Sequence, residues 1–212
     1  MRIICLKHGN KYSSEYVNIL FKRLTDTTPS MTEFVCYTDN TDGIDKQIQV
    51  QLLPREAIWG WWWKPWILAH QPQGYNLFVD LDMLIVSDMS VYKPELPGIT
   101  VLSNGRKINS SIIGFFSSVQ APWAELKANR DHHVTQPAPY GDQEIFSLCA
   151  DRRELQIHTY DSVHTAWLGR PDRNEPLAKN FNQQTASIVC KGPRNPHEHM
   201  DNPYVKKYWN KL

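Results

Sequence analysis

The sequence predicts an α/β fold with a mixed, mostly parallel central sheet flanked by helices. Short apolar runs alternate along the chain with amphipathic stretches, which is the pattern of strands that alternate with helices. The chain has 212 residues, the length of one sizeable domain, and its Pro- and Gly-containing stretches are short enough to be loops inside it. We therefore expect residues 1–212 to form a single domain.

The composition excludes some classes of partner. Lysine and arginine number 23 against 22 aspartates and glutamates, so the chain lacks the basic excess of a nucleic-acid-binding protein. No stretch approaches the roughly 18 apolar residues of a membrane span. The four cysteines are far apart and form no CxxC pair, which is typical of a reducing compartment. Since the N-terminus reads as a strand rather than a signal peptide, we expect a cytoplasmic protein.

The first part of the chain predicts a β-α unit followed by two strands. The apolar run Arg2–Leu6 suits a buried strand, and Ser13 and Ser14 precede a helical period. That period places four apolar side chains on one face: Val17, Leu20, Phe21 and Leu24. The runs Glu33–Tyr37 and Gln47–Leu53 predict strands, the second with the polar and apolar alternation of a half-buried strand.

The most apolar run of the chain, Asn76–Val86 (NLFVDLDMLIV), predicts a central strand. Before it, Pro65 suits the first turn of a helix that reaches about Gln71. The remaining predicted elements are a strand at Ser111–Phe116, a helix at Asp142–Ala150 begun by its own aspartate, strands at Leu155–Tyr160 and Ser187–Cys190, and a short helix after Pro203.

Asp80 and Asp82 flank Leu81 inside the predicted central strand. Carboxylates in such an apolar run need a partner that offsets their desolvation. Residues i and i+2 of a strand project to the same face, so the two carboxylates would converge and repel unless a cation or a shared proton lies between them. Hard oxygen ligands favour Mg²⁺ or Mn²⁺. The alternative is that one aspartate caps a turn while the other forms a surface ion pair.

These residues also carry a family resemblance. The run NLFVDLDMLIVSDMS resembles the DxD strand of GT-A nucleotide-sugar glycosyltransferases, in particular family 8, the glycogenin and bacterial lipopolysaccharide galactosyltransferase type. Five more segments resemble stretches of that family in the same order: FVCYTDN, Trp63-Lys64, INSSIIGF, GDQEIF and IVCKGPRNPHE. The resemblance covers most of the chain. A lone DxD is a weak signal, whereas six segments in order are more specific, and they imply a GT-A-like fold.

The resemblance implies a divalent cation, Mn²⁺ or Mg²⁺, with Asp82 as a direct ligand. Asp80 would help to hold both the metal and the ribose. The family's C-terminal loop usually supplies a histidine ligand, but Lys191 followed by Gly192 stands there in this sequence. Three alternatives remain: Lys191 neutralises a phosphate by its charge, His197 or the nearby His199 reaches the metal, or water fills the position.

The resemblance also implies donor-binding and catalytic roles. Uracil would lie beside Thr38, packed on Leu6 and hydrogen-bonded to Asp39. The sugar would be bound by the polar residues of the INSS stretch: Asn109, Ser110 and Ser111. The alternative is that these three residues only form a turn.

Three further residues are implied to act at the leaving group and the reacting sugar. Lys64 would add positive charge at the departing diphosphate; alternatively it is a solvated surface lysine. Asp142, with Gln143 as its companion, would orient the sugar or accept a proton from the acceptor. The alternative for Asp142 is a helix N-cap and nothing more.

The segment WGWWWKPW contains five of the eight tryptophans. Burying large rings removes much apolar area from water, so we expect most of them to pack against the sheet. One or two could stay exposed at the rim of the site as a platform for an acceptor sugar. A membrane foothold is disfavoured because Lys64 is the one basic residue at hand.

The sequence therefore predicts a metal-dependent glycosyltransferase that moves a sugar from a UDP-sugar to an unidentified acceptor, which could be a glycan, a protein or a small molecule. The resemblance implies retention at the anomeric carbon. One alternative is a metal-dependent nucleotidyltransferase or phosphohydrolase, which typically needs a third acidic ligand or a Gly-rich phosphate loop. Another is a non-catalytic, Trp-rich glycan-binding protein.

Overall fold

The computed structural model describes residues 1–55, 58–105, 107–137, 140–168, 180–190 and 195–209. In this part of the chain the strands form a seven-stranded sheet of order β3-β2-β1-β4-β7-β6-β8 and a three-stranded sheet of order β5-β10-β9. The strands of the large sheet are β1 (Arg2–Lys7), β2 (Glu33–Thr38), β3 (Gln49–Leu52), β4 (Asn76–Val79), β6 (Ile99–Ser103), β7 (Ile108–Phe115) and β8 (Ile157–Thr159). Those of the small sheet are β5 (Met83–Ile85), β9 (Thr165–Leu168) and β10 (Ser187–Cys190).

The large sheet is mixed and mostly parallel, as predicted. Strands β2 and β4 run parallel to β1. Strand β3 runs parallel to β2, and β8 runs parallel to β6. Among the described strands of this sheet, only β7 is antiparallel to its neighbours, β4 and β6. Successive side chains of β1 alternate between two buried clusters: Ile3 belongs to one and Ile4 to the other. Both faces of the central strands are therefore covered, which explains their continuous apolar runs.

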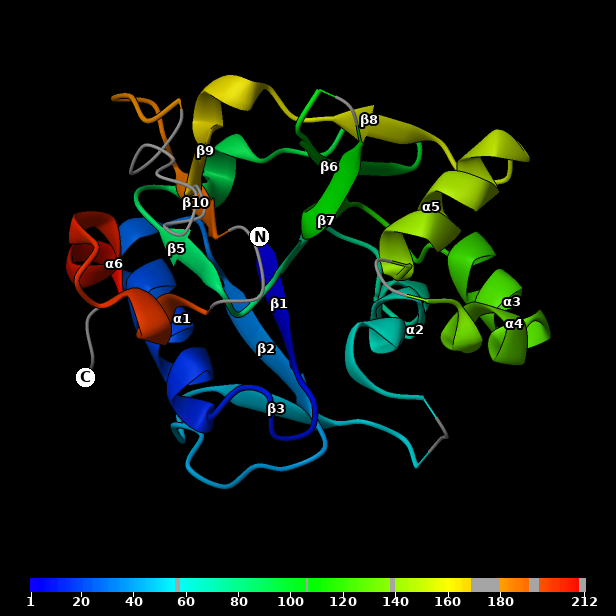
Figure 1. The fold of residues 1–212 in the computed structure, drawn as a ribbon, viewed down its shortest axis with the longest axis horizontal. Coiled ribbons are helices and arrows are strands. Elements are labelled where there is room, and N and C mark those ends of the chain that lie inside the picture. The colour runs from blue at the N-terminus through cyan, green and yellow to red at the C-terminus, as the bar shows by residue number, and fades with distance from the viewer. Residues whose placement is uncertain (56–57, 106, 138–139, 169–179, 191–194, 210–212) are drawn as a thin grey trace.

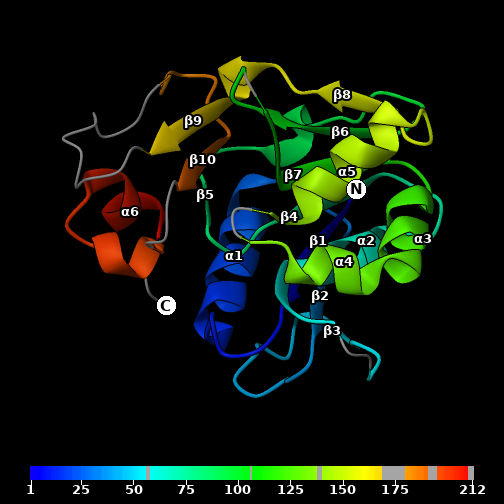
Figure 2. The ribbon, with the colours of Figure 1, turned by 45° about the vertical axis from the view of Figure 1, so that its right-hand side comes forward.

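The helices cover the two faces in separate groups (Figures 1 and 2). Beside the small sheet lie α1 (Ser14–Thr27) and α6 (Pro203–Tyr208). The other group comprises α2 (Trp63–Ala69), α3 (Ala121–Ala128), α4 (Arg130–Thr135) and α5 (Asp142–Asp151). Short 3₁₀ turns are η1 (Gly60–Trp62), η2 (Met89–Val91), η3 (Ser162–His164) and η5 (Pro196–His199). None of the helices in the described ranges has the length and apolar character needed to cross a bilayer.

The prediction of one continuous strand at Asn76–Val86 is wrong. Strand β4 ends at Val79, and the chain then turns and enters the other sheet as β5. The backbone N–H of Asp80 still donates to the carbonyl oxygen of Ser111 (2.8 Å), whereas the N–H of Met83 bonds back to the Asp80 carbonyl (3.4 Å). A continuous buried strand would enclose both carboxylates in apolar surroundings. The turn instead carries Asp80 and Asp82 to the edge of the large sheet, so the same-face argument for a strand does not apply.

Several smaller predictions are corrected. Strand β3 is exposed rather than half-buried, because it forms the edge of the sheet. Helix α5 begins after Gly141 as N-cap, so Asp142 is its first residue and makes no cap. Strands β6 and β9 and helices α3 and α4 were not expected. The other predicted strands and helices are present within a few residues of their predicted limits.

Candidate active site

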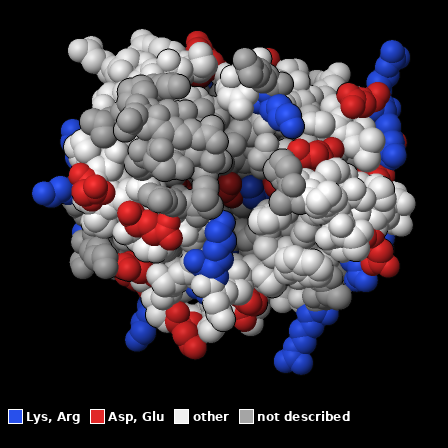
Figure 3. All heavy atoms as spheres, in the orientation of Figure 1, with Lys and Arg blue, Asp and Glu red and all other residues white. Residues whose placement is uncertain are grey.

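A cavity of about 670 Å³ opens where β1 and β4 end. Figure 3 shows a hollow in the middle of this face, with atoms of acidic and basic side chains visible inside it. Carboxyl ends of strands at the edge of an α/β sheet are the usual place for ligands. Seven of the predicted site residues line the cavity: Leu6, Lys64, Asp80, Asp82, Ser110, Asp142 and Gln143.

Lys64, near the start of α2, is the centre of a buried charge cluster. The side chain is only 5% exposed, and its ammonium lies 2.9 Å from Asp80 Oδ1 and 3.4 Å from Asp142 Oδ2. The ammonium also donates to the carbonyl oxygen (3.2 Å) and the Oγ (3.3 Å) of Ser110. Burial lowers the pKa of Lys64, but the carboxylates of Asp142 and Asp80 outweigh burial and raise the pKa above its ordinary value. The alternative of a solvated surface lysine is therefore wrong.

The three aspartates of the cavity crowd negative charge around this one buried ammonium. The pKa of Asp80 is raised to about 6, chiefly by burial; the charges of Asp82 and Asp142 add to this shift and Lys64 opposes it. Asp142 Oδ2 is buried and makes no hydrogen bond, and its contact with Lys64 is an ion pair at 3.4 Å. This arrangement favours additional positive charge or a hydrogen-bond donor in the cavity.

The donor set of Asp80 and Asp82 fits a hard divalent cation. Asp82 accepts a hydrogen bond from the hydroxyl of Tyr12 (2.8 Å) through Oδ2. Burial and the Asp82 charge raise the pKa of Tyr12, so the phenol stays protonated. Among the described residues, no three His, Cys, Asp or Glu side chains form a complete metal site. Two carboxylates are nevertheless a common protein contribution to a Mg²⁺ site, where substrate phosphates and water complete the shell.

His197 lies next to Tyr16, outside the cavity lining. Its Nδ1 is hydrogen-bonded to the hydroxyl of Tyr16 in α1, and the two rings meet edge to face. Neither His197 nor His199 lines the cavity. Lys191 and Gly192 lie outside the described residues.

The predicted uracil-binding pair at the end of β2 lies outside the cavity lining. Thr38 Oγ1 donates to the carbonyl oxygen of Asn40 (2.8 Å) and accepts from its N–H (3.1 Å), so this hydroxyl serves a turn. Both carboxylate oxygens of Asp39 accept from the N–H of Gly9 (3.1 and 3.0 Å). Only Leu6, on the neighbouring strand, faces the cavity.

The predicted sugar-binding stretch is only partly at the cavity. Ser110 lines it, but Asn109 and Ser111 do not. Asn109 Oδ1 accepts from the N–H of Ser111 (3.0 Å), which shapes the strand instead. The alternation of a strand explains this result, because neighbouring residues of β7 point to opposite faces.

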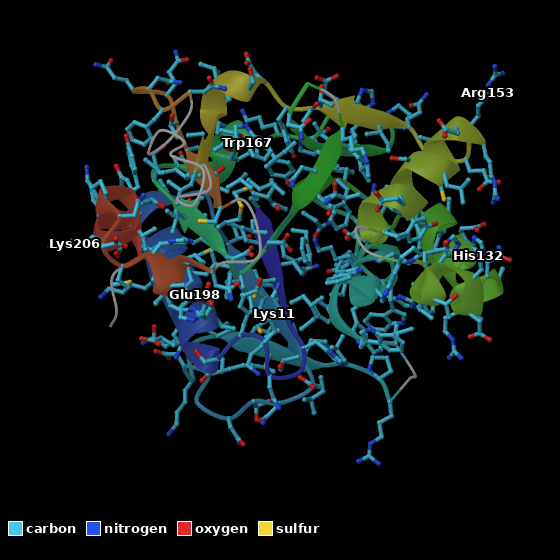
Figure 4. The ribbon with its side chains drawn as sticks, in the orientation of Figure 1. Lys11, His132, Arg153, Trp167, Glu198 and Lys206 are labelled. Carbon is cyan, nitrogen blue, oxygen red and sulfur yellow. The ribbon has the colours of Figure 1, made fainter. Side chains whose placement is uncertain are left out.

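The polar and aromatic cavity residues that sequence reasoning missed are His8, Lys11, Tyr12, Lys107, Tyr140 and Glu144. Lys11 and Tyr12 lie in the loop after β1, and Lys11 stands near the middle of the face in Figure 4. Its ammonium lies 4.6 Å from the centre of the Tyr12 ring. Loops that follow the carboxyl ends of strands commonly carry ligand-binding residues, so the polar stretch GNKYSS could have been recognised.

The tryptophan-rich segment divides as expected between packing and exposure. Trp62 and Trp63 are buried, and Trp66 is partly buried. Trp59 and Trp61 are 53% and 47% exposed, and of these two only Trp61 lines the cavity.

This chain was compared with known proteins by sequence and by fold, and the matches came from the fold. No family model and no curated protein matches this sequence. Among solved structures, the galactosyltransferase LgtC in complex with donor and acceptor sugar analogs superimposes with a TM-score of 0.66 at 12% identity, over 99% of this chain and 94% of LgtC. The apo form of the glycosyltransferase GlyE from Streptococcus pneumoniae TIGR4 gives 0.68 at 11% identity, over 98% of this chain but 59% of GlyE.

These likenesses confirm the expected fold, and at 11–12% identity they establish the fold alone. The described sheet order, the cavity at the strand ends and the near-complete overlap with LgtC agree with one another. The chain thus has the GT-A-like fold seen in the glycosyltransferases LgtC and GlyE.

Proposed function

We propose that this protein is a metal-dependent glycosyltransferase that moves a sugar from a UDP-sugar donor to an acceptor, with retention at the anomeric carbon. One observation carries the proposal: the cluster of Lys64, Asp80 and Asp142 lies in a cavity at the strand ends of a GT-A-like fold. The fold is shared with a galactosyltransferase that was crystallised with donor and acceptor sugar analogs. Retention rests on the resemblance alone.

Lys64 supplies fixed positive charge for the departing diphosphate. Its ammonium is held by Asp80 and Ser110, so little reorganisation is needed when negative charge develops on the leaving oxygen. Lys11 and Lys107 also line the cavity and add positive charge for the phosphates.

Asp80 and Asp82 would hold Mn²⁺ or Mg²⁺ through their carboxylate oxygens. The raised pKa of Asp80 supports this assignment, because carboxylates crowded around one ammonium are relieved by a further cation. When bound, the metal supplies Lewis-acid stabilisation of the leaving diphosphate.

Asp142 and Gln143 would act at the reacting sugar. The buried Asp142 Oδ2 without a hydrogen bond is suited to accept one from a sugar hydroxyl or from the acceptor. Gln143 lines the same wall of the cavity, and a Gln-to-Glu active-site mutant of LgtC has been crystallised. A glutamine therefore belongs to the active site of that enzyme, which supports the role proposed for Gln143.

The proposal includes a cytoplasmic location. All four cysteines are free thiols, which agrees with a reducing compartment.

The decisive experiment measures thermal unfolding with UDP, with Mn²⁺, with both, and with ADP plus Mn²⁺, for wild type and Asp82→Ala. A ligand that binds only the folded state at about 100 times its dissociation constant adds roughly 2.7 kcal/mol of stability. We expect synergistic stabilisation by UDP and Mn²⁺ in wild type, none by ADP, and loss of the synergy in Asp82→Ala. If no combination shifts wild type, the proposal fails.

Product analysis separates the proposal from related chemistry. A glycosyltransferase releases UDP and forms a glycoside or free sugar, whereas a nucleotidyltransferase releases pyrophosphate. A glycan-binding protein binds saccharide without nucleotide or metal.

A further inference from the structure

Trp61 presents an exposed aromatic face to the cavity. It is 47% exposed, while the two tryptophans that follow it are buried. A large ring left in water forgoes the stabilisation that burial gives its neighbours. Trp59 is exposed as well, but it does not line the cavity, so the two exposed rings form a natural pair of test position and control.

The segment that carries Trp61 contacts two other residues of the cavity lining, His8 and Gly141. Trp61 is the middle residue of η1, and the N–H of Gly60 at its start donates to Nδ1 of His8 (3.1 Å). On the other side, the indole lies against the backbone of Gly141: a Cβ built on that glycine would be 3.2 Å from the indole nitrogen. Since Gly141 directly precedes Asp142, the ring lies next to the wall that carries the proposed catalytic residues.

Tyr140 forms a second aromatic wall of the same cavity. Its hydroxyl is hydrogen-bonded to Nδ1 of His133 (2.8 Å), and the two rings stack with centroids 5.9 Å apart. Its other neighbour is Trp62, with centroids 6.2 Å apart. An aromatic side chain fixed in this way offers contact area at little cost in conformational entropy.

The chemistry next to these rings matches a sugar. A sugar ring has an apolar C–H face and an edge of hydroxyl groups. Trp61 offers a flat apolar surface, and the carboxylate of Asp142 and the amide of Gln143 line the cavity beside it as hydrogen-bond partners. A lipid chain would require a continuous apolar channel, which the charged cluster around Lys64 interrupts.

We propose that Trp61 is the platform on which the acceptor packs, and that the acceptor is therefore a glycan rather than a lipid. This inference rests on the proposed function. That function assigns the charged residues around Lys64 to the donor and leaves the aromatic residues Trp61 and Tyr140 for the acceptor.

The test compares wild type with Trp61→Ala, Trp61→Phe and the control Trp59→Ala. Lactose, maltose and cellobiose are titrated in the presence of UDP and Mn²⁺, and binding is followed by saturation-transfer NMR. We expect at least one disaccharide to bind wild type and Trp59→Ala equally well. In Trp61→Ala its dissociation constant rises roughly tenfold, the change that about 1.4 kcal/mol of lost contact produces, and Trp61→Phe restores part of the affinity.

The thermal shift with UDP and Mn²⁺ is measured on every variant, and it should persist in all of them. Absence of disaccharide binding to wild type, or equal binding to wild type and Trp61→Ala, overturns the glycan-acceptor inference while leaving the donor site intact. Loss of the UDP shift in Trp61→Ala overturns it too, because Trp61 would then serve the donor. Saccharide binding through Trp61 without any UDP shift in wild type overturns the proposed function, and the acceptor role with it.

Discussion

Two buried clusters of charged side chains in this protein differ in how completely the carboxylate oxygens are hydrogen-bonded by the protein itself. Glu125 of α3 accepts hydrogen bonds from His133 Nε2 (2.8 Å), Arg152 Nη1 (2.6 Å) and Asn129 Nδ2 (3.0 Å), and it does not line the cavity. The Lys64 cluster lines the cavity, and there the buried Asp142 Oδ2 lacks a hydrogen bond. Figure 4 places His132, the neighbour of His133, on α4 at the far right of the view, away from Lys11 at the centre.

The pKa shifts of the two clusters have opposite directions. Burial raises the pKa of Glu125, but the hydrogen bonds from His133 and Arg152 outweigh burial and lower it. Burial raises the pKa of Asp80, and Lys64 does not compensate. A carboxylate whose charged form is stabilised by hydrogen bonds from the protein contributes to the stability of the fold. A carboxylate whose charge remains uncompensated is suited to bind a ligand. The comparison therefore indicates a structural role for Glu125 and supports the proposed binding role of Asp80.

The largest expected effect comes from Lys64→Met. Without the ammonium, Asp80 and Asp142 repel each other and the leaving diphosphate loses its fixed positive charge. We expect UDP-sugar turnover to fall roughly a hundredfold or more. The free energy of unfolding should fall by about 3 kcal/mol, since a broken buried ion pair leaves charge unpaired. Turnover assays and urea unfolding measure both effects; unchanged turnover would contradict the assignment of Lys64.

The Asp142→Asn variant tests whether Asp142 acts in the chemical step or in nucleotide binding. The amide keeps the size of the side chain but removes the charge and replaces one acceptor oxygen with an NH2 group that can only donate. We expect kcat to fall on the order of a hundredfold, the range of general acid–base effects, while the affinity for UDP stays the same. Steady-state kinetics and UDP titration test this expectation. A variant that loses UDP affinity instead would place Asp142 in the nucleotide site.

Glu125→Gln is the matched change in the other cluster. The neutral amide loses the charge-assisted hydrogen bonds from His133 and Arg152. We expect the free energy of unfolding to fall by about 2 kcal/mol. Activity per folded molecule should not change, because Glu125 does not line the cavity. Loss of turnover at full folding would show that the two clusters are coupled.

The smallest expected effect is a pH dependence of the Glu125 contribution. The pKa of Glu125 in the folded state lies below its ordinary value of 4.5. Its contribution to stability is therefore fully present above the pKa of the unfolded chain and is lost as the pH falls through the folded-state pKa. The stability difference between wild type and Glu125→Gln should be constant near neutral pH and shrink under acid. Urea unfolding at a series of pH values measures it, and a difference that grows under acid would be the wrong sign.

Buried strands were predicted well because apolar runs bounded by polar residues leave few alternatives. Strand β10 matches its predicted range, and β1 and β2 extend one residue beyond theirs. The run Asn76–Val86 failed for the same reason: its residues remain apolar on both sides of the turn, since β4 and β5 are buried in different sheets. The hydrophobic pattern of a sequence indicates which residues are buried, but it does not indicate where the chain leaves one sheet and enters another.

The candidate site was predictable as a set of residue types but not as a set of contacts. The DxD pair and the GDQ stretch indicated most of the acidic groups of the cavity. The partner of Asp82 is Tyr12, which lies 70 residues away in the sequence, and no local pattern joins the two. The contact of His197 with Tyr16 likewise depends on the packing of α1, and the role of His197 as a metal ligand stays a prediction.

The Lys64 cluster also has a consequence for assembly of the chain. Its members come from four separate elements: Lys64 from α2, Asp80 from the turn after β4, Ser110 from β7 and Asp142 from α5. Such contacts join segments that are far apart in the sequence, so the entropy of loop closure must be paid before they can form. A molecule in which α5 has not yet docked lacks part of the cluster, so a ligand that needs all four elements selects fully folded chains. Ligand-induced protection from proteolysis would then extend across the whole sheet rather than remain local to the cavity.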